Sequence, residues 1–384
     1  MRVTGDWLTS VDTQTVLGML TGAGYRAYAV GGCVRNALLG VPVADVDIAT
    51  SALPEEVIQL AESAGLKPIP TGLEHGTITV ISNGEPHEVT TFRKDVDTDG
   101  RRAVVAYSDN ITDDAIRRDF TVNALYVEAD GTLHDPLGGL PDIKARRIRF
   151  IEDPAKRIEE DYLRILRFFR FTAWYGDQTA GLDAEGLAAC ATHVDGISKL
   201  SKERLGAEMK KLLSAPDPAP ALAAMAACGV LAQILPGADP RYITPLIHLE
   251  QAAKILPSWQ RRMVALGGDN HAKRLRLSKV EGKHLNEVTA AMQSGESTKI
   301  MAYRFGAAAT LDAKMIEAAT LSSPLPDMLH AHIAEGVKAT FPVKAVDLID
   351  RLGAGPQLGV ELKRLENLWI AADFKVGKKE LLQS

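Results

Sequence analysis

The apolar positions of the first 150 residues follow two different periods. Helical spacing runs over residues 13–22 and again from a Gly31-Gly32 pair through Leu39. Short runs rich in β-branched residues lie between and beyond these helices, and they predict strands at residues 25–30, 45–49, 77–81, 87–92 and 121–127. Short strands mixed with helices predict an α+β domain with a small mixed sheet.

The second part of the chain has the pattern of helices alone. Long amphipathic stretches occur at residues 158–175, 202–213 and 360–369, and proline and glycine interrupt the pattern at residues 216–220 and 353–356. We therefore predict three domains, which are a mixed domain over residues 1–150 and helical domains over residues 151–215 and 216–384. The sequence carries no pattern that specifies an oligomeric state.

Composition restricts the class of protein. With 46% hydrophobic and 24% charged residues, the chain can bury full-sized cores. It has no apolar stretch near the roughly 18 residues of a membrane span and no signal-peptide pattern, so we expect no membrane contact and a cytoplasmic location. The cysteines lack the spacing of a zinc site or a disulfide framework; they are Cys33, Cys190 and Cys228.

A net charge of −5 argues against a uniformly basic surface for nucleic acid. Arginine is instead concentrated locally, at Arg117-Arg118, at residues 146–149 and along residues 157–170. Local clusters of this kind favour a polyphosphate ligand or an RNA held at one place. Two later clusters, Arg261-Arg262 and Lys273-Arg274-x-Arg276, are candidates for RNA phosphate contacts, with solvated helix faces as the alternative.

Two carboxylates in a predicted strand form a candidate metal site. The two-residue period of a strand points Asp45 and Asp47 to one face and Val46 to the other. Glu88, in the next well-patterned strand, completes an oxygen cluster if the two strands are neighbours. Oxygen ligands without His or Cys suit Mg²⁺, which shares its site with substrate phosphates. Alone, such a pair is more often a set of solvated surface acids.

A glycine turn before the acidic pair favours the metal site over solvated surface acids. Gly31-Gly32 stands between a predicted strand and a predicted helix, where glycine permits close backbone approach, and Arg35 offers a phosphate contact. The order of strand, Gly-Gly, helix and Asp-x-Asp strand resembles the nucleotidyltransferase superfamily related to DNA polymerase beta.

Further motifs are similar to those of the class II tRNA nucleotidyltransferase and bacterial poly(A) polymerase family. They are Gly31-Gly32-x-Val34-Arg35 with Asp45-x-Asp47, Glu74-His75-Gly76-Thr77, residues 88–93, the signature Arg117-Arg118-Asp119-Phe120-Thr121-Val122-Asn123-Ala124, residues 135–139 and residues 160–170. The resemblance is dense from residue 28 to about residue 210. It implies a polymerase-beta-like head followed by an all-helical neck, body and tail, and template-independent addition of CCA to tRNA from CTP and ATP.

The resemblance also implies roles for individual residues. Asp45 and Asp47 would bind Mg²⁺ and, with Glu88, serve catalysis, while the Gly31-Gly32 turn would bind the nucleotide. The other nucleotide contacts that it implies are Arg35, Arg117, Arg118, Asp119, Asn123, Asp161, Arg164, Arg167 and Arg170. One departure is visible, because the family has Asp where this chain has Asn36. An asparagine still accepts a hydrogen bond from the neighbouring arginine but lacks the charge.

Residues 160–170 can also be interpreted without the family. We predict one helix over residues 158–175, in which Asp161, Arg164 and Arg167 contact one another and the buried stripe is Leu163, Leu166 and Phe169. An Asp acceptor beside an Arg donor can pair with cytosine or adenine but not with uracil or guanine. The run is therefore either a surface ion-pair ladder or a protein template, and the resemblance implies the template.

Residues 94–102 are polar and contain glycine, which predicts a mobile loop. In the family such a loop helps the enzyme to switch from C to A addition. Three alternatives stay open: an enzyme that adds only A, a poly(A) polymerase, and a non-catalytic RNA-binding protein with a degenerate head. The intact residues Asp45, Asp47, Glu88 and Arg118 argue against the last of these.

Overall fold

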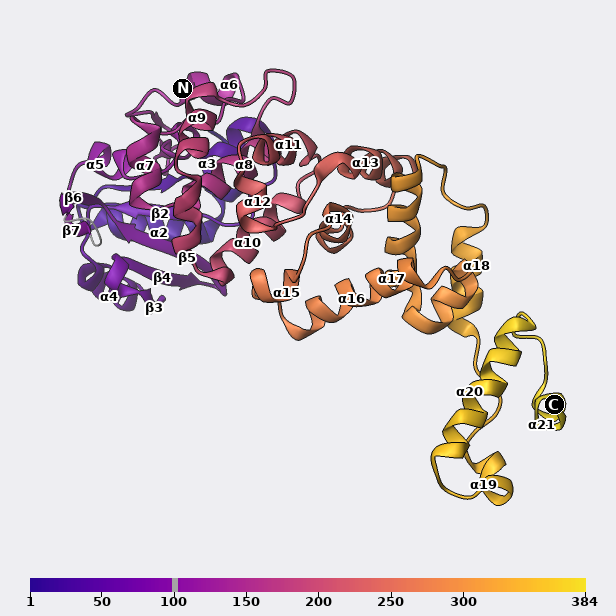
Figure 1. Cartoon of the computed structure of the whole chain (residues 1–384). Helices are drawn as coiled ribbons and strands as arrows, with labels where there is room; N and C mark the ends of the chain where they lie inside the picture. Colours follow the sequence, from indigo (N-terminus) through magenta and orange to yellow (C-terminus); the bar gives the residue numbers. More distant parts are fainter. Residues whose placement is uncertain (99–102) are drawn as a thin grey trace. The chain divides into compact units, whose positions relative to one another are not determined.

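The computed structural model describes residues 1–98 and 103–384 (Figure 1). The chain divides into two compact units, residues 1–234 and residues 235–384. The strands all lie in the first unit and the second unit is built from helices, which confirms an α+β region followed by an all-helical one. The three-domain division at residues 150 and 215 stays a prediction.

A seven-stranded mixed sheet, in the order β3-β4-β5-β2-β1-β8-β9, organises the first unit. Its strands are β1 (Ala27–Val30), β2 (Asp47–Thr50), β3 (Lys67–Gly72), β4 (Thr77–Ser82), β5 (Glu85–Thr91), β8 (Tyr126–Val127) and β9 (Leu133–His134). β1 and β2 are antiparallel, whereas β2 and β5 are parallel with Asp47 paired to Glu88. The parallel pair therefore brings the two strands with candidate catalytic acids side by side.

Helices cover one face of this sheet. α2 (Val11–Gly22) and α4 (Pro54–Ser63) both pack against β4, and the α2 side chains of Val16, Leu17 and Leu20 are fully buried. The opposite face has its own core of Val30, Ala49, Phe92, Ala115, Ala124, Tyr126 and Ile151. Because cross-strand partners share a face, the pairings Val30–Asp47 and Asp47–Glu88 put both acids on this second face.

β6 (Arg93–Thr98) and β7 (Ala103–Tyr107) form a separate antiparallel hairpin. The predicted loop over residues 94–102 is thus wrong over residues 94–98, because these residues lie in β6 and pair with β7, as Lys94 does with Ala106. The rest of the predicted loop, residues 99–102, lies outside the described residues.

The strand predicted at residues 121–127 is wrong over most of its length. Thr121–Asn123 form a 3₁₀ helix and only Tyr126–Val127 pair as β8. Side chains fix this turn, since Asn123 Nδ2 donates to Asp119 Oδ1 at 2.9 Å and Thr121 Oγ1 donates to Asp142 Oδ2 at 2.6 Å. Such local hydrogen bonds compete successfully with β pairing.

The single helix predicted at residues 158–175 is two helices, α7 (Pro154–Glu160) and α8 (Leu163–Tyr175). Asp161 breaks the run, because its backbone is extended (φ −154°, ψ 104°) and its Oδ1 accepts a hydrogen bond from the Leu163 amide at 3.1 Å. The predicted buried stripe is confirmed, since Leu163, Leu166 and Phe169 are all buried.

The remaining helices complete both units. The first unit contains α1 (Asp6–Thr9), α3 (Gly32–Leu39), α5 (Ile111–Ile116), α6 (Leu140–Lys144), α9 (Ala184–Thr192), α10 (Lys202–Leu213), α11 (Ala219–Ala227) and α12 (Val230–Ile234). The second contains α13 (Ile243–Ala252), α14 (Trp259–Leu266), α15 (His271–Arg274), α16 (Lys279–Ser294), α17 (Thr298–Leu321), α18 (Leu329–Lys338), α19 (Val346–Leu352), α20 (Pro356–Ala371) and α21 (Lys378–Gln383).

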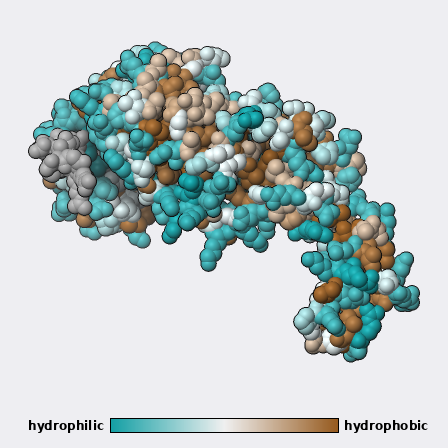
Figure 2. Space-filling model, viewed as in Figure 1, coloured by the Kyte–Doolittle hydropathy of each residue, from teal (hydrophilic) through white to brown (hydrophobic). Residues whose placement is uncertain are grey.

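In the part of the chain that the structure describes, no helix is both long enough and apolar enough to cross a membrane. Figure 2 shows hydrophilic residues spread over the visible face, with hydrophobic ones in separate patches between them.

Arg261 and Arg262 do not offer their charges to RNA, so that prediction is wrong. Both are buried, with Arg261 donating to Glu250 Oε1 (2.7 Å) and Asp312 Oδ1 (2.8 Å), and Arg262 donating to Glu250 Oε2 (2.6 Å). His284 extends the network to Asp312 Oδ2 at 3.0 Å, and this hydrogen bond raises the pKa of His284 despite partial burial. One carboxylate, Glu250, therefore holds two buried guanidinium groups.

We expect Glu250→Ala to lower the free energy of unfolding by about 3–5 kcal/mol, because it removes the carboxylate that both buried arginines share. Glu287→Ala is the comparison variant, since Glu287 pairs with the exposed side chain of Lys283 at 3.5 Å and its charge acts on His284, outside the two buried arginines; it should cost at most about 0.5 kcal/mol. Denaturant-induced unfolding of the full chain measures both. A Glu250→Ala variant as stable as the control would contradict the structural role of the network.

Candidate active site

The candidate metal ligands lie at the start of β2. Asp47 is its first residue and Asp45 lies two residues earlier; both are exposed, whereas Val46 and Ile48 are buried. The predicted alternation of acids outward and apolar residues inward is therefore confirmed. The predicted neighbourhood with Glu88 is confirmed as well, because Asp47 and Glu88 occupy the same register position of parallel strands.

The electrostatics of this edge favour a cation. Desolvation and then the charge of Glu88 raise the pKa of Asp47; Asp45 adds to the effect and Arg118 opposes it. A bound cation would relieve this crowding of negative charge. Among the described residues no three His, Cys, Asp or Glu side chains are arranged to hold a metal by themselves. A cation here would need water or phosphate as further ligands, which is the usual environment of Mg²⁺.

The Gly31-Gly32 turn lies at the N-terminus of α3 and is built around two arginines. Gly31 has φ 75°, and a Cβ there would lie 3.2 Å from Nη1 of Arg118. A Cβ on Gly32 would lie 3.8 Å from Nη2 of Arg35. Glycine is thus required at Gly31 by its backbone, and it lets a guanidinium group approach the turn. The free amide groups of the α3 N-terminus and these charges suit an anion.

Arg118 is held in place by an acid and a phenol. Its Nη2 lies 3.0 Å from Asp114 Oδ2, and its Nε lies 3.1 Å from the hydroxyl of Tyr126. Burial alone would lower the pKa of Arg118, but Asp114 and Tyr126 more than compensate and raise it. The sequence analysis missed both partners, although the i,i+4 spacing of Asp114 and Arg118 was a usable signal for the first.

Arg35 connects the turn to α8. Its side chain is buried and donates to Asn123 Oδ1 (2.5 Å), Asn36 Oδ1 (2.8 Å) and the Tyr175 hydroxyl (2.9 Å). The prediction that Asn36 still accepts a hydrogen bond from Arg35 is confirmed. A direct contact of Arg35 with phosphate stays a prediction.

Asp119 ties the same region to the middle of α8. It is buried, its Oδ1 accepts from Asn123 Nδ2 at 2.9 Å, and its Oδ2 accepts from Arg167 Nε at 2.6 Å. Burial acts to raise the pKa of Asp119, but the charge of Arg167 and these hydrogen bonds hold it below its usual value. Asp119 is therefore a charged anchor for α8 in this structure, and its predicted contact with the nucleotide is untested.

The predicted ladder of Asp161, Arg164 and Arg167 is wrong, because Asp161 lies outside the helix and each residue has another partner. Asp161 pairs with Arg204 at 2.6 Å, and Arg164 pairs with Glu160 at 2.5 Å. Arg164 also donates to the backbone carbonyls of Arg157 (2.8 Å) and Arg117 (3.0 Å), and Arg170 pairs with Glu208 at 2.6 Å. Asp161 and Arg164 nevertheless stay close in space, because the Arg164 amide donates to the Asp161 carbonyl at 2.9 Å.

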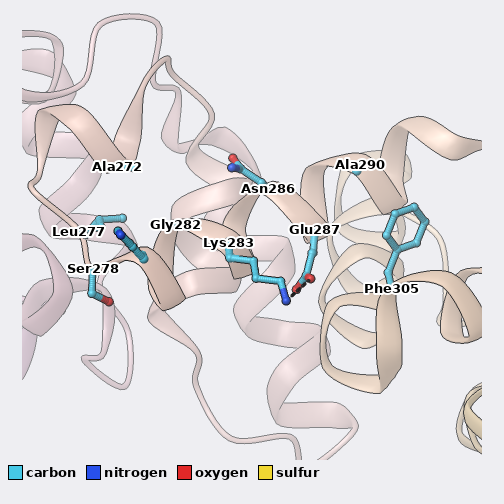
Figure 3. Close-up of a pocket in the computed structure, with 10 residues that line it drawn as sticks. Ala272, Leu277, Ser278, Gly282, Lys283, Asn286, Glu287, Ala290 and Phe305 are labelled. Atoms are coloured by element: carbon cyan, nitrogen blue, oxygen red, sulfur yellow. Dashed lines mark ion pairs between the residues drawn. The ribbon is translucent and has the colours of Figure 1, made fainter.

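A second candidate site is a groove of about 640 Å³ in the second unit (Figure 3). α16 supplies most of its lining, and Phe305 lies at one end of it while Leu277 and Ser278 lie at the other (Figure 3). Its charged lining residues are Lys279, Lys283 and Glu287, and the last two pair with each other at 3.5 Å.

Two family models match parts of the first unit and the residues that follow it. Residues 27–149 match the family model described as the poly A polymerase head domain, and residues 182–241 match the model described as a probable RNA and SrmB-binding site of polymerase A. The first match contains Gly31, Asp45, Asp47, Glu88 and the residues around Arg118, so all of the geometry described at the acidic edge lies inside it.

Several curated proteins are similar to the chain. The mitochondrial CCA tRNA nucleotidyltransferase 1 of Mus musculus is 44% identical over 185 residues, which are 48% of this chain and 43% of that protein. The match therefore spans less than half of the mitochondrial relative. The CCA-adding enzyme of Streptococcus pyogenes serotype M2 is 34% identical over 374 residues, covering 91% of this chain and 90% of that enzyme.

Solved structures of CCA-adding enzymes have a similar fold. The Bacillus stearothermophilus CCA-adding enzyme, solved in complex with CTP, is similar with a TM-score of 0.74 and 27% identity over 94% of this chain and 93% of that one. The Thermotoga maritima CCA-adding enzyme, solved with tRNA, shares the fold with a TM-score of 0.70 at 18% identity. With the acidic edge, the glycine turn and a full-length relative at 34% identity in agreement, the chain belongs to the family of the CCA-adding enzymes.

Proposed function

We propose that the chain is a template-independent tRNA nucleotidyltransferase that builds or repairs the 3′-terminal CCA with CTP and ATP and releases pyrophosphate. The observation that carries this proposal is the register of Asp47 with Glu88, on the same sheet as the turn of Gly31. We assign residues 1–150 to the catalytic head, 151–215 to base recognition and 216–384 to tRNA binding, and we place the enzyme in the cytoplasm.

Asp45 and Asp47 would hold divalent cations, for which Mg²⁺ is our choice, and Glu88 would complete or polarise that site. When bound, such cations lower the pKa of an attacking hydroxyl and neutralise a leaving pyrophosphate. The outward-facing carboxylates of Asp45 and Asp47 and the raised pKa of Asp47 support this assignment. The tRNA 3′-hydroxyl would attack the α-phosphorus directly, so no covalent intermediate with the enzyme is expected.

The glycine turn and its arginines would bind the triphosphate. Asp114 and Tyr126 fix the direction of Arg118, whose Nη1 lies beside Gly31, so its charge is preorganised and costs little to reorient when the phosphates arrive. We assign Arg117 and Arg118 to phosphate or ribose contacts and Asp119 to the ribose. Positioning and charge neutralisation would supply most of the rate enhancement.

Base selection is assigned to Asp161 and Arg164. An Asp acceptor and an Arg donor match the amino group and ring nitrogen that cytosine and adenine present side by side, whereas uracil and guanine present the reverse. In this structure the two side chains are paired with Arg204 and Glu160. Base binding would therefore exchange an ion pair of each residue for a contact with the nucleobase.

Product length on defined transcripts tests the proposed function. With tRNA transcripts that end before CCA, after C and after CC, the enzyme should extend each to CCA and stop, and it should leave oligoadenylate unextended. Extension of the CC transcript alone would instead identify an enzyme that adds only A. Long tails on oligoadenylate would identify a poly(A) polymerase, and tRNA binding without extension would identify a non-catalytic protein.

We expect Asp47→Ala to abolish incorporation while the dissociation constant for tRNA changes only a few-fold, since phosphate contacts by Lys and Arg persist. Asp130→Ala is the control, because Asp130 is an exposed carboxylate of the same unit that pairs with Arg2 at 3.1 Å; it should keep wild-type rates. Turnover by Asp47→Ala in Mg²⁺ would remove Asp47 from the catalytic role.

Asp161→Ala should reduce the preference for CTP over UTP by about 1–3 kcal/mol in kcat/KM, the scale of an unpaired polar group at a base edge. Catalysis should persist because the acidic edge is unchanged. Arg204→Ala is the matched control, since it removes the same ion pair and leaves the acceptor in place. If Asp161→Ala and Arg204→Ala keep the wild-type ratio, or lose it equally, Asp161 is only a partner of Arg204.

A further inference from the structure

Arg35 is enclosed by the C-terminal end of α8. Its guanidinium carbon lies 4.0 Å from the ring centroid of Tyr175 and 5.0 Å from that of Phe171, in addition to its hydrogen bond with the Tyr175 hydroxyl. The side chain is buried, and three oxygen acceptors and two aromatic rings surround its charge in place of water, while its Nε has no partner among the described residues. Neither a carboxylate nor the backbone of α8 takes part in the hydrogen bonds of Arg35 that the structure describes.

These contacts belong to a closed ring of interactions. Arg35 donates to Asn123 at 2.5 Å, Asn123 donates to Asp119 at 2.9 Å, and Asp119 accepts from Arg167 at 2.6 Å. Arg167 then lies 5.1 Å from the ring of Phe171, which is also the ring above Arg35. This closed set of side-chain contacts connects α3, the 3₁₀ helix of residues 121–123 and α8.

The two ends of α8 thus face different parts of the proposed site. Tyr175, its last residue, holds Arg35, whose guanidinium lies against Gly32 of the glycine turn. The first turn carries Arg164, directly after Asp161. A helix of this length is a rigid rod of about 20 Å, so a shift at Tyr175 displaces Arg164 relative to the turn.

We propose that Tyr175 is a positioning residue for base selection, which clamps Arg35 and thereby fixes the distance between the glycine turn and the base-reading end of α8. The proposal rests on the proposed function and adds to it a residue that acts through its contact with Arg35. Phe171 assists, because its ring lies within 5.1 Å of the guanidinium carbons of Arg35 and Arg167, and 4.4 Å from that of Arg170. A ring face placed among three like charges keeps them apart and attracts each of them.

Tyr175→Leu removes the ring and the hydroxyl, whereas Tyr175→Phe keeps the ring. We expect Tyr175→Leu to raise KM for CTP and ATP about 3- to 30-fold, to lower the CTP/UTP ratio of kcat/KM by a similar factor, and to leave kcat within about 3-fold. Tyr175→Phe should recover most of both parameters. Trp174→Leu is the control for loss of a neighbouring aromatic ring, because the Trp174 ring lies 6.4 Å from that of Tyr175 and its indole donates to the Lys211 carbonyl, whereas the described contacts of Arg35 do not include it.

Steady-state kinetics on a transcript ending before CCA measures all variants beside the wild type. A Tyr175→Leu variant that is folded and keeps the wild-type ratio overturns the proposal, and so does an equal loss in Trp174→Leu. If Tyr175→Leu does not fold, Phe171→Leu is tested in its place with the same expected loss of ratio. An inactive wild type would refute the proposed function itself, whereas an active wild type with an unchanged ratio in the variants refutes only the role of Tyr175.

Discussion

The parallel pairing of β2 with β5 is the constraint on which the candidate site depends. This pairing fixes Asp47 and Glu88 at one register position, so they cannot separate without breaking the sheet. Buried apolar residues on the same face, Val30 and Ala49 among them, hold these strands in place. Hydrophobic burial thus maintains an unfavourable pair of charges, as is common at sites that bind cations.

The positive charges around this edge are themselves fixed by acids away from it. Asp114 holds Arg118 under the glycine turn, and Asp119 holds Arg167 on α8. Each arginine is therefore directed by a carboxylate that lies outside the acidic edge, and Arg118 remains near enough to Asp47 to oppose the rise of its pKa. Because these arginines pair with other carboxylates, they lie near the acidic edge without forming ion pairs with Asp47 that any described contact shows.

Features that depend on neighbouring residues could be predicted from the sequence, whereas features that depend on partners far away in the chain could not. Strand alternation predicted which way Asp45 and Asp47 point, and the helix of Gly32 was read correctly from the turn before it. The break at Asp161 was missed because helical spacing continues across it, whereas one side-chain hydrogen bond to Leu163 ends α7. Tyr175 could not be assigned, because it meets Arg35 across 140 positions of the chain.

The two arginine pairs of the chain show why a basic cluster in sequence does not identify an RNA surface. Arg117-Arg118 and Arg261-Arg262 are the same dipeptide in the sequence, but in the fold the two pairs contact different carboxylates at different distances along the chain. Arg261 and Arg262 meet Glu250, 11 and 12 positions before them, and Arg261 meets Asp312, 51 positions after it; all of these side chains are buried. Arg118 pairs with Asp114, four positions before it, and stays about a quarter exposed. A guanidinium group can serve a phosphate only where its local acids leave donors directed to solvent, and that property is decided by tertiary contacts and not by the density of arginine.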